Sequence, residues 1–127
     1  MESVIQTQTP AMGAGADEKE ELRKIYRRLG YLQIKVLKAL AENGGKMMMH
    51  YDTGYDVPAI GDLVDSGYTA EQHAWNTKKV CLSLQRRGLA TITVEKCPNH
   101  KGRDKEFVYL TEKGYKMVEI IKEYENE

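Results

Sequence analysis

The chain has 127 residues, which is enough for one small domain with a buried core but not for two. It carries 19 basic and 19 acidic side chains, so the formal net charge is zero and the total charge favours no acidic partner. No apolar stretch approaches the roughly 20 residues of a membrane helix, no signal peptide is recognisable, and two cysteines make no disulfide framework. We therefore expect a soluble, cytoplasmic protein without membrane contact.

Charge is unevenly distributed along the chain. Residues 70–105 contain eight Lys/Arg and three Asp/Glu, whereas residues 42–69 and 106–127 are both acidic. A neutral chain with a basic middle can still present a positive face, and the local field decides which partners that face attracts.

The first 42 residues divide into a tail and a helical region. Residues 1–16 are polar and without periodicity, so we expect a disordered tail before a single domain over 17–127. Within 17–42, apolar residues recur in steps of three and four, which is typical of amphipathic helices. Gly30 interrupts this pattern and predicts either a kink or two helices, at about 18–29 and 31–42. The exposed faces of this region carry the cations Arg23, Lys24, Arg27 and Arg28. Such a run either forms a solvated face or contacts phosphate.

A short segment rich in methionine and tyrosine follows the helix end at Asn43-Gly44-Gly45. We expect Met47, Met48 and Met49, within 46–57, to form a short strand or loop that packs on the core. The same side chains are also suited to line a ligand pocket, because methionine adapts its shape readily. Core packing is the preferred interpretation.

Residues 57–88 indicate a helix-turn-helix. Pro58 suits the first turn of a short helix, since its missing N–H has no partner there. Ser66-Gly67 then supplies the turn, and Thr69 is placed to cap a second, longer helix over 70–87 that Gly88 ends. Two helices joined by a short turn that contains glycine are typical of this motif.

The longer helix has two distinct faces. Thr77, Cys81 and Leu84 belong to its apolar stripe, whereas the opposite face combines amides, cations and one tryptophan. Amide side chains can pair with adenine, and cations can reach guanine or phosphate. The alternative is that Trp75 folds back onto the core and the cations are merely solvated. The candidate DNA-binding residues of this helix are Gln72, His73, Trp75, Asn76, Lys78, Lys79, Ser83 and Arg86.

Residues 89–110 predict a β-hairpin. The segments 89–96 and 107–110 have strand character, and the basic loop between them places Lys101, Arg103 and Lys105 near the tip. A hairpin directly after a helix-turn-helix is a wing, and its tip is suited to contact the DNA backbone or minor groove.

The last helix, 111–126, is expected to begin at Thr111 as its cap. Its apolar face is broader than a small lone domain needs, so we expect a partner chain to cover the excess.

No metal, cofactor or enzymatic activity is expected. Cys97 and His100 have the spacing of half a zinc site, but structural zinc normally takes four ligands and the second pair is missing. Cys97 is either a reactive thiol or a loop cysteine without function, and Cys81 is expected in the core. The sequence contains no glycine-rich phosphate loop and no Ser/His/Asp arrangement.

Two segments resemble those of MarR-type winged-helix regulators: Leu84-Gln85-Arg86-Arg87-Gly88-Leu89-Ala90 and Val108-Tyr109-Leu110-Thr111-Glu112-Lys113-Gly114. PadR-like regulators and small viral or archaeal winged-helix proteins have similar segments. The resemblance implies a homodimer formed by the terminal helices, with the long helix in the major groove. By position, Asn76, Lys78 and Lys79 match groove-contacting residues and Arg103 matches the wing arginine. The expected dimer-interface residues are Leu22, Ile25, Leu29, Val118, Ile121 and Tyr124.

These observations predict an α+β, mostly helical fold: a winged helix-turn-helix with a two- to three-stranded wing and terminal dimerisation helices. The leading hypothesis is a dimeric, sequence-specific regulator of transcription that binds double-stranded DNA. It places helix 70–87 in the major groove and wing 96–106 on the backbone or minor groove. The alternative is a winged-helix module that binds proteins and not DNA. The sequence points to no particular small-molecule effector.

Overall fold

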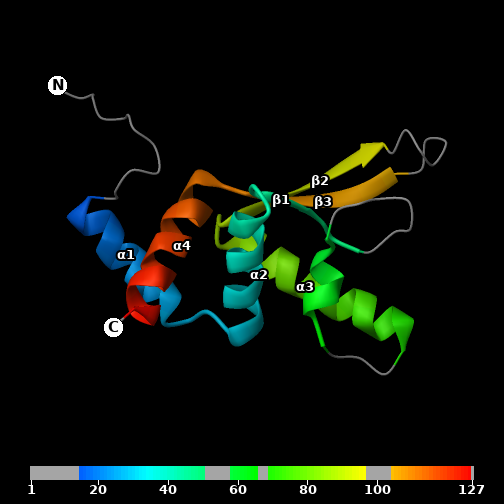
Figure 1. The fold of residues 1–127 in the computed structure, drawn as a ribbon, viewed down its shortest axis with the longest axis horizontal. Coiled ribbons are helices and arrows are strands. Elements are labelled where there is room, and N and C mark those ends of the chain that lie inside the picture. The colour runs from blue at the N-terminus through cyan, green and yellow to red at the C-terminus, as the bar shows by residue number, and fades with distance from the viewer. Residues whose placement is uncertain (1–14, 51–57, 66–68, 97–103, 127) are drawn as a thin grey trace.

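The computed structural model describes residues 15–50, 58–65, 69–96 and 104–126 (Figure 1). They form an α+β fold of four α-helices, one short 3₁₀ helix and a three-stranded antiparallel sheet. Several predictions fall wholly or partly outside these residues: the tail over 1–16 except for its last two residues, positions 51–57 of the segment 46–57, the turn at Ser66-Gly67, and the wing tip with Cys97, Lys101 and Arg103. Ala16, which was expected in the tail, is the first residue of a helix.

The N-terminal region contains two helices, as one of the two alternatives predicted. Helix α1 spans Ala16–Tyr26 and helix α2 spans Tyr31–Glu42, so α1 begins and ends earlier than expected. Gly44 and Gly45 then adopt φ angles of 78° and 88°, which side chains disfavour. The Gly45 N–H donates to the Leu40 carbonyl at 2.7 Å and closes the end of α2.

The sheet brings together segments from both halves of the chain. Its strands are β1 (Lys46–Met48), β2 (Ala90–Lys96) and β3 (Asp104–Leu110), in the order β1-β3-β2. Val108 of the central strand lies opposite both Met47 and Ile92. Strand β3 begins earlier than predicted, so Lys105 lies in the strand opposite Glu95 and not in the loop.

The first helix of the predicted helix-turn-helix is shorter than expected. Residues Ile60–Leu63 form the 3₁₀ helix η2, and no α-helix begins at Pro58. The reason lies in the preceding residue: Ala59 is extended, with φ −110° and ψ 146°, and makes a parallel bridge with Met48. This contact with the strand segment prevents a helical turn from starting at Pro58.

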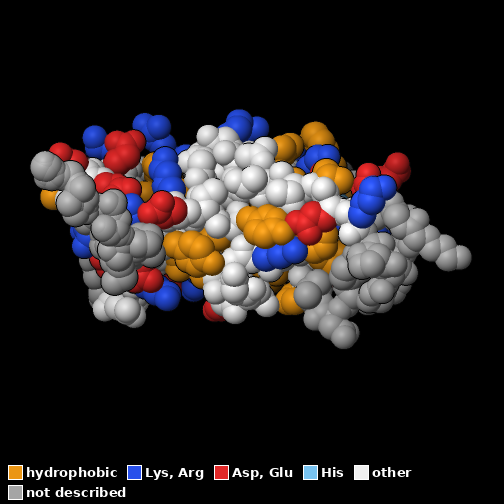
Figure 2. Space-filling view, turned by 90° about the horizontal axis from the view of Figure 1, so that it is seen from above, with side chains coloured by type: hydrophobic (Ala, Val, Ile, Leu, Met, Phe, Trp, Pro, Cys, Tyr) orange, Lys and Arg blue, Asp and Glu red, His pale blue; other side chains and the backbone are white. Residues whose placement is uncertain are grey.

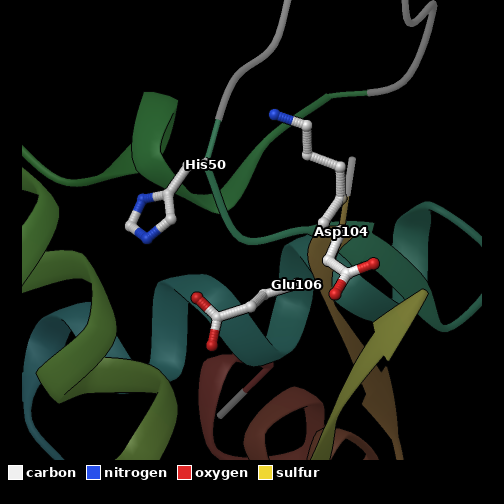
Figure 3. Close-up of a pocket in the computed structure, with 4 residues that line it drawn as sticks. His50, Asp104 and Glu106 are labelled. Carbon is white, nitrogen blue, oxygen red and sulfur yellow. The ribbon is translucent and has the colours of Figure 1, made fainter. Parts of the chain in front are cut away.

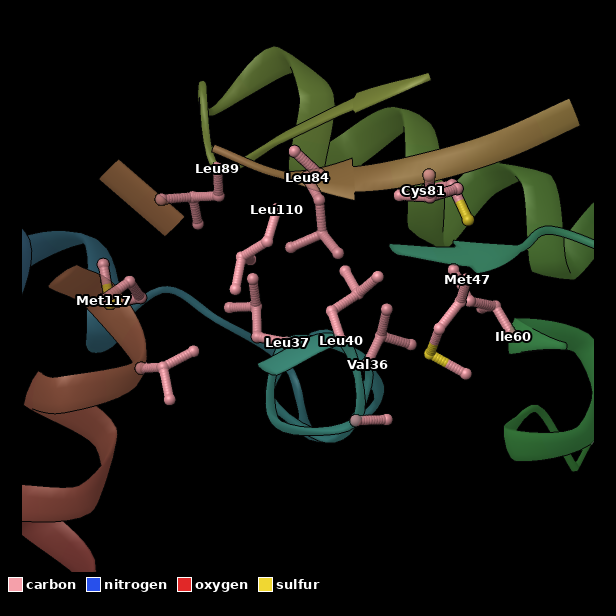
Figure 4. Close-up of a cluster of buried hydrophobic side chains, with 14 of the residues drawn as sticks. Val36, Leu37, Leu40, Met47, Ile60, Cys81, Leu84, Leu89, Leu110 and Met117 are labelled. Carbon is pink, nitrogen blue, oxygen red and sulfur yellow. The ribbon is translucent and has the colours of Figure 1, made fainter. Parts of the chain in front are cut away.

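The core fills the space between α2, α3 (Ala70–Arg86), α4 (Glu112–Glu125) and one face of the sheet. Figure 4 shows aliphatic side chains from α2 converging on Leu84, Leu89 and Leu110. Met47, Met48 and Met49 are at most 2% exposed, so the methionine segment is core, as the preferred interpretation predicted. Helix α1 packs on α4 at one end, where Tyr26 stacks on Tyr124 with ring centroids 4.3 Å apart.

Candidate nucleic-acid interface

Helix α3 is fixed at its start and along one face. The Thr69 hydroxyl accepts a hydrogen bond from the Gln72 N–H at 3.0 Å, which confirms Thr69 as the N-cap. Thr77, Cys81 and Leu84 are fully buried, so the side of the helix that carries them packs against the core. Burial raises the pKa of the Cys81 thiol to about 12, so this cysteine stays protonated and unreactive in the folded chain.

The outward face of α3 presents polar and cationic side chains together with one tryptophan. Gln72, Trp75, Lys79 and Arg86 are exposed, while Asn76 and Ser83 are half-buried beside them. The Trp75 side chain is 56% exposed, so it does not fold back onto the core. These positions recur three and four residues apart and therefore form one continuous strip along the helix.

His73 faces η2 and is engaged in holding it. Its Nε2 atom lies 2.9 Å from the Gly61 carbonyl oxygen and 2.8 Å from that of Val64. Both partners are acceptors, so Nε2 carries the proton and donates to them. The structure therefore gives His73 a structural contact that attaches the short helix to α3.

Lys78 and Ser83 also contact other elements of the fold. The Lys78 ammonium lies 3.3 Å from the Glu106 carboxylate of β3, which sequence reasoning had not connected to α3. The Ser83 hydroxyl donates to the Val80 carbonyl at 2.8 Å and accepts from the Gln33 amide. Lys105 is half-buried in β3 beside Glu106 and not in the wing tip, while Lys101 and Arg103 are outside the described residues.

The outer face of the sheet differs from the α3 strip in its charge. Figure 2, viewed from above the sheet, shows hydrophobic, basic and acidic side chains interspersed. The Lys46 ammonium there lies 3.2 Å from Glu95, whose carboxylate also accepts a hydrogen bond from Tyr109. These hydrogen bonds, first that of Tyr109 and then that of Lys46, lower the pKa of Glu95. The cation is thus already paired, and this face offers little to an anionic partner.

A small pocket of about 170 Å³ lies beside the wing strand (Figure 3). Its lining includes His50, Asp104 and Glu106, and the Glu106 carboxylate lies on the side of the His50 ring while Asp104 points away. Burial lowers the pKa of His50, which keeps its imidazole neutral near pH 7. Within the described part of the chain, no three His, Cys, Asp or Glu side chains come together as metal ligands.

The predicted dimer residues are largely covered by their own chain. Leu22, Val118 and Ile121 are at most 2% exposed because α1 packs on α4. Ile25, Leu29 and Tyr124 are partly buried against the same core. The expectation that a partner must cover this apolar face is therefore wrong for Leu22, Val118 and Ile121, since one chain buries both helices against each other.

Comparisons with known proteins add no relative. No protein-family model matches the chain, and neither the curated proteins nor the solved structures contain a match. No helix among the described residues is long and apolar enough to cross a membrane.

Proposed function

We propose that this protein is a MarR-like winged-helix regulator of transcription that binds double-stranded DNA as a homodimer and recognises a specific sequence. In this proposal η2 and α3 form the helix-turn-helix, and the hairpin of β2 and β3 forms the wing. The order of these elements along the chain supports it, because a short helix precedes the long one and the hairpin follows directly.

The observation that carries the proposal is the composition of the exposed strip on α3. The strip combines Gln72, which can pair with adenine, and Lys79 and Arg86, which can reach guanine or phosphate. Neither cation forms an ion pair with another described residue, so both are free to meet an anion. The only acidic residue of the helix is Glu71, in its first turn. An α-helix of this kind fits the width of the major groove.

The other predicted contacts have different roles in the proposal. Trp75 extends the strip and can pack on sugar or on a thymine methyl group. Lys78 forms an ion pair with Glu106. Its ammonium can therefore contact a phosphate only if this ion pair opens or if the ammonium binds both anions at once. His73 is left out of the interface because its Nε2–H is taken by η2.

A salt titration of DNA binding tests the proposal. Fluorescence anisotropy with a labelled random-sequence duplex should show affinity that falls steeply with salt, because lysines and arginines displace counterions from phosphates. Size-exclusion chromatography with light scattering on the same sample should give the mass of a dimer. Absence of binding even at low salt would reject the DNA proposal, and a monomeric mass would reject the dimer alone.

Lys79→Ala is the first informative variant. If Lys79 meets a phosphate, its loss should weaken binding to all sequences and lower the salt slope by about one. Lys122→Ala is the matched control, because Lys122 is equally a surface lysine but lies on α4 and pairs with Glu119. An unchanged slope for Lys79→Ala would remove this residue from the interface.

A protein-interaction module remains the second candidate function, favoured by the exposed Trp75. Tryptophan is enriched at the energetic centres of protein interfaces. The two functions differ in the salt titration, since a protein-binding module predicts no steep dependence on salt with duplex DNA.

A further inference from the structure

A cluster of four arginines lies where the α1–α2 turn meets the end of α3. It consists of Arg27, Arg28, Arg86 and Arg87. The Arg87 guanidinium donates to the Arg28 carbonyl oxygen at 3.4 Å, which places the turn beside the last residues of α3. The hydrogen bond between Gln33 and Ser83, one turn earlier on α3, closes the same seam.

The turn that carries Arg27 and Arg28 is well fixed. Its backbone N–H groups at 27, 28 and 29 donate to the carbonyls of Arg23, Ile25 and Tyr26, at 2.9 to 3.1 Å. Leu29 packs against the main core. The two arginine side chains are exposed and make no described contact of their own, because the contact with Arg87 uses the Arg28 backbone.

Two cations of α1, Lys19 and Arg23, differ from these arginines in having a carboxylate partner. Lys19 and Arg23 both lie 3.6 Å from Glu123, and Lys116 of α4 lies 3.0 Å from Glu18. These pairs join α1 to α4. Among the described residues, no carboxylate pairs with any of the four clustered arginines. The positive charge of the helical region is therefore uncompensated at the seam with α3.

The cluster borders the exposed strip of α3. Ser83 lies four residues after Lys79 and three before Arg86, so these three side chains share a face. The Ser83 hydroxyl on this face accepts a hydrogen bond from Gln33 of α2. Gln72 and Arg86 are separated along the helix axis by about 20 Å. The cluster thus lies at the C-terminal end of the strip, against the α1–α2 turn.

We propose that this arginine cluster is a second anchor for the phosphate backbone of DNA, located at the C-terminal end of α3 and on the α1–α2 turn. The inference rests on the proposed function and extends its footprint to Arg27 and Arg28, which neither the helix-turn-helix nor the wing contains. Arginine suits this role because its planar guanidinium binds phosphate through two parallel hydrogen bonds. The exposed Arg27, Arg28 and Arg86 are therefore suited to contact backbone phosphates, while Arg87 holds the turn beside α3.

The test is a salt titration of Arg27→Ala/Arg28→Ala with a random-sequence duplex of about 25 base pairs, which spans the 20 Å several times over. The wild-type chain is titrated first, because a steep salt dependence establishes the DNA interface. The double variant should then lose about two units of salt slope and at least about tenfold in affinity at low salt. Its urea unfolding midpoint should stay unchanged, since neither side chain contributes to the fold.

Two matched variants separate a local site from net charge. Lys38→Ala/Lys122→Ala removes the same charge from α2 and α4 outside the cluster and should keep the wild-type slope. Arg27→Lys/Arg28→Lys keeps the charge and should keep most of the slope. A wild-type slope in Arg27→Ala/Arg28→Ala would overturn this inference while leaving the proposed function intact. An equal loss of slope in Lys38→Ala/Lys122→Ala would do the same. No DNA binding by the wild-type chain would overturn both.

Discussion

At the scale of single residues, His73 shows that a polar side chain on a candidate interface can have a structural task. The Nε2–H of His73 donates to the carbonyl oxygens of both Gly61 and Val64, and these hydrogen bonds are half-buried. Both acceptors belong to the segment before α3, so the hydrogen bonds fix η2 relative to the helix. While it holds η2 in place, the Nε2–H of His73 is not available to a phosphate.

His73→Ala should lower the free energy of unfolding by about 1–2 kcal/mol, because it removes the donor for two half-buried carbonyls. Urea denaturation followed by circular dichroism measures this change. The salt slope of DNA binding should stay at its wild-type value, since the ring is directed at η2. Trp75→Ala is the control, and at its exposed position a stability change within about 0.5 kcal/mol is expected. A reduced slope for His73→Ala would instead assign the ring to phosphate.

The sequence predicted the exposed residues of the candidate site better than the paired ones. The 3.6-residue period placed Trp75, Lys79 and Arg86 on one face, and the structure exposes all three. The pairing of Lys78 with Glu106 depends on a strand 28 positions later in the chain, and no local pattern encodes that distance. The contact between Arg87 and the Arg28 carbonyl was not predicted either, because these residues are also far apart in the chain.

At the scale of elements, the start of α4 is packed directly against the end of α3. The Thr111 hydroxyl accepts from the Gly114 N–H at 3.0 Å and donates to the Gly88 carbonyl at 2.7 Å. Thr111 therefore caps α4, as predicted, and also joins it to the turn after α3. Gly114 completes this contact, because a Cβ atom there would lie 2.2 Å from the Leu89 carbonyl oxygen.

Gly114→Ala should destabilise the protein even though alanine is the better helix former. Helix propensity alone predicts a gain of about 1 kcal/mol. The added methyl group would meet a backbone oxygen and also Leu110, 2.6 Å away, and overpacking of this kind costs about 1–3 kcal/mol or more. A lower urea midpoint is the expected result, with Lys113→Ala as a control close to wild type. A raised midpoint for Gly114→Ala would show that α4 shifts without cost.

Element boundaries were predictable where local chemistry sets them. The glycines at 44, 45 and 88 have positive φ and end α2 and α3 as expected, and Thr69 and Thr111 cap the helices that follow them. The short helix η2 was mispredicted because Ile60, Leu63 and Val64 have helical spacing but their conformation depends on pairing with β1. The Gly61 N–H donates to the Met49 carbonyl at 2.9 Å, a tertiary contact that the local pattern does not contain.

At the scale of the whole molecule, the two ends of the described chain are packed together. Helices α1 and α4 share the stacked Tyr26 and Tyr124 rings and the ion pairs to Glu123. Exposed ion pairs contribute little, so the apolar contacts made by residues such as Leu22 account for most of the stability of this pairing. A dimer of this protein would therefore need surfaces other than these buried side chains.

Stability of the whole molecule should also depend on pH through His50. Burial lowers the pKa of His50 from its ordinary 6.5, with Lys78, His73 and Lys105 acting in the same direction and Glu106 opposing them. Because the folded pKa lies below the unfolded one, the stability is fully present above about pH 6.5 and is lost as the pH falls toward the folded pKa. The free energy of unfolding should thus decline as the pH falls from about 6.5 toward the folded pKa of His50.

His50→Gln isolates this contribution, because glutamine keeps a polar side chain that does not titrate. Urea denaturation of both proteins across this range should show a smaller decline for the variant. Glu95, whose pKa is lowered from its ordinary 4.5, acts in a more acidic window and leaves the comparison undisturbed. An identical decline in the two proteins would mean that His50 takes up its proton equally well in the folded and unfolded states, and the pocket beside the wing strand would then be open to water.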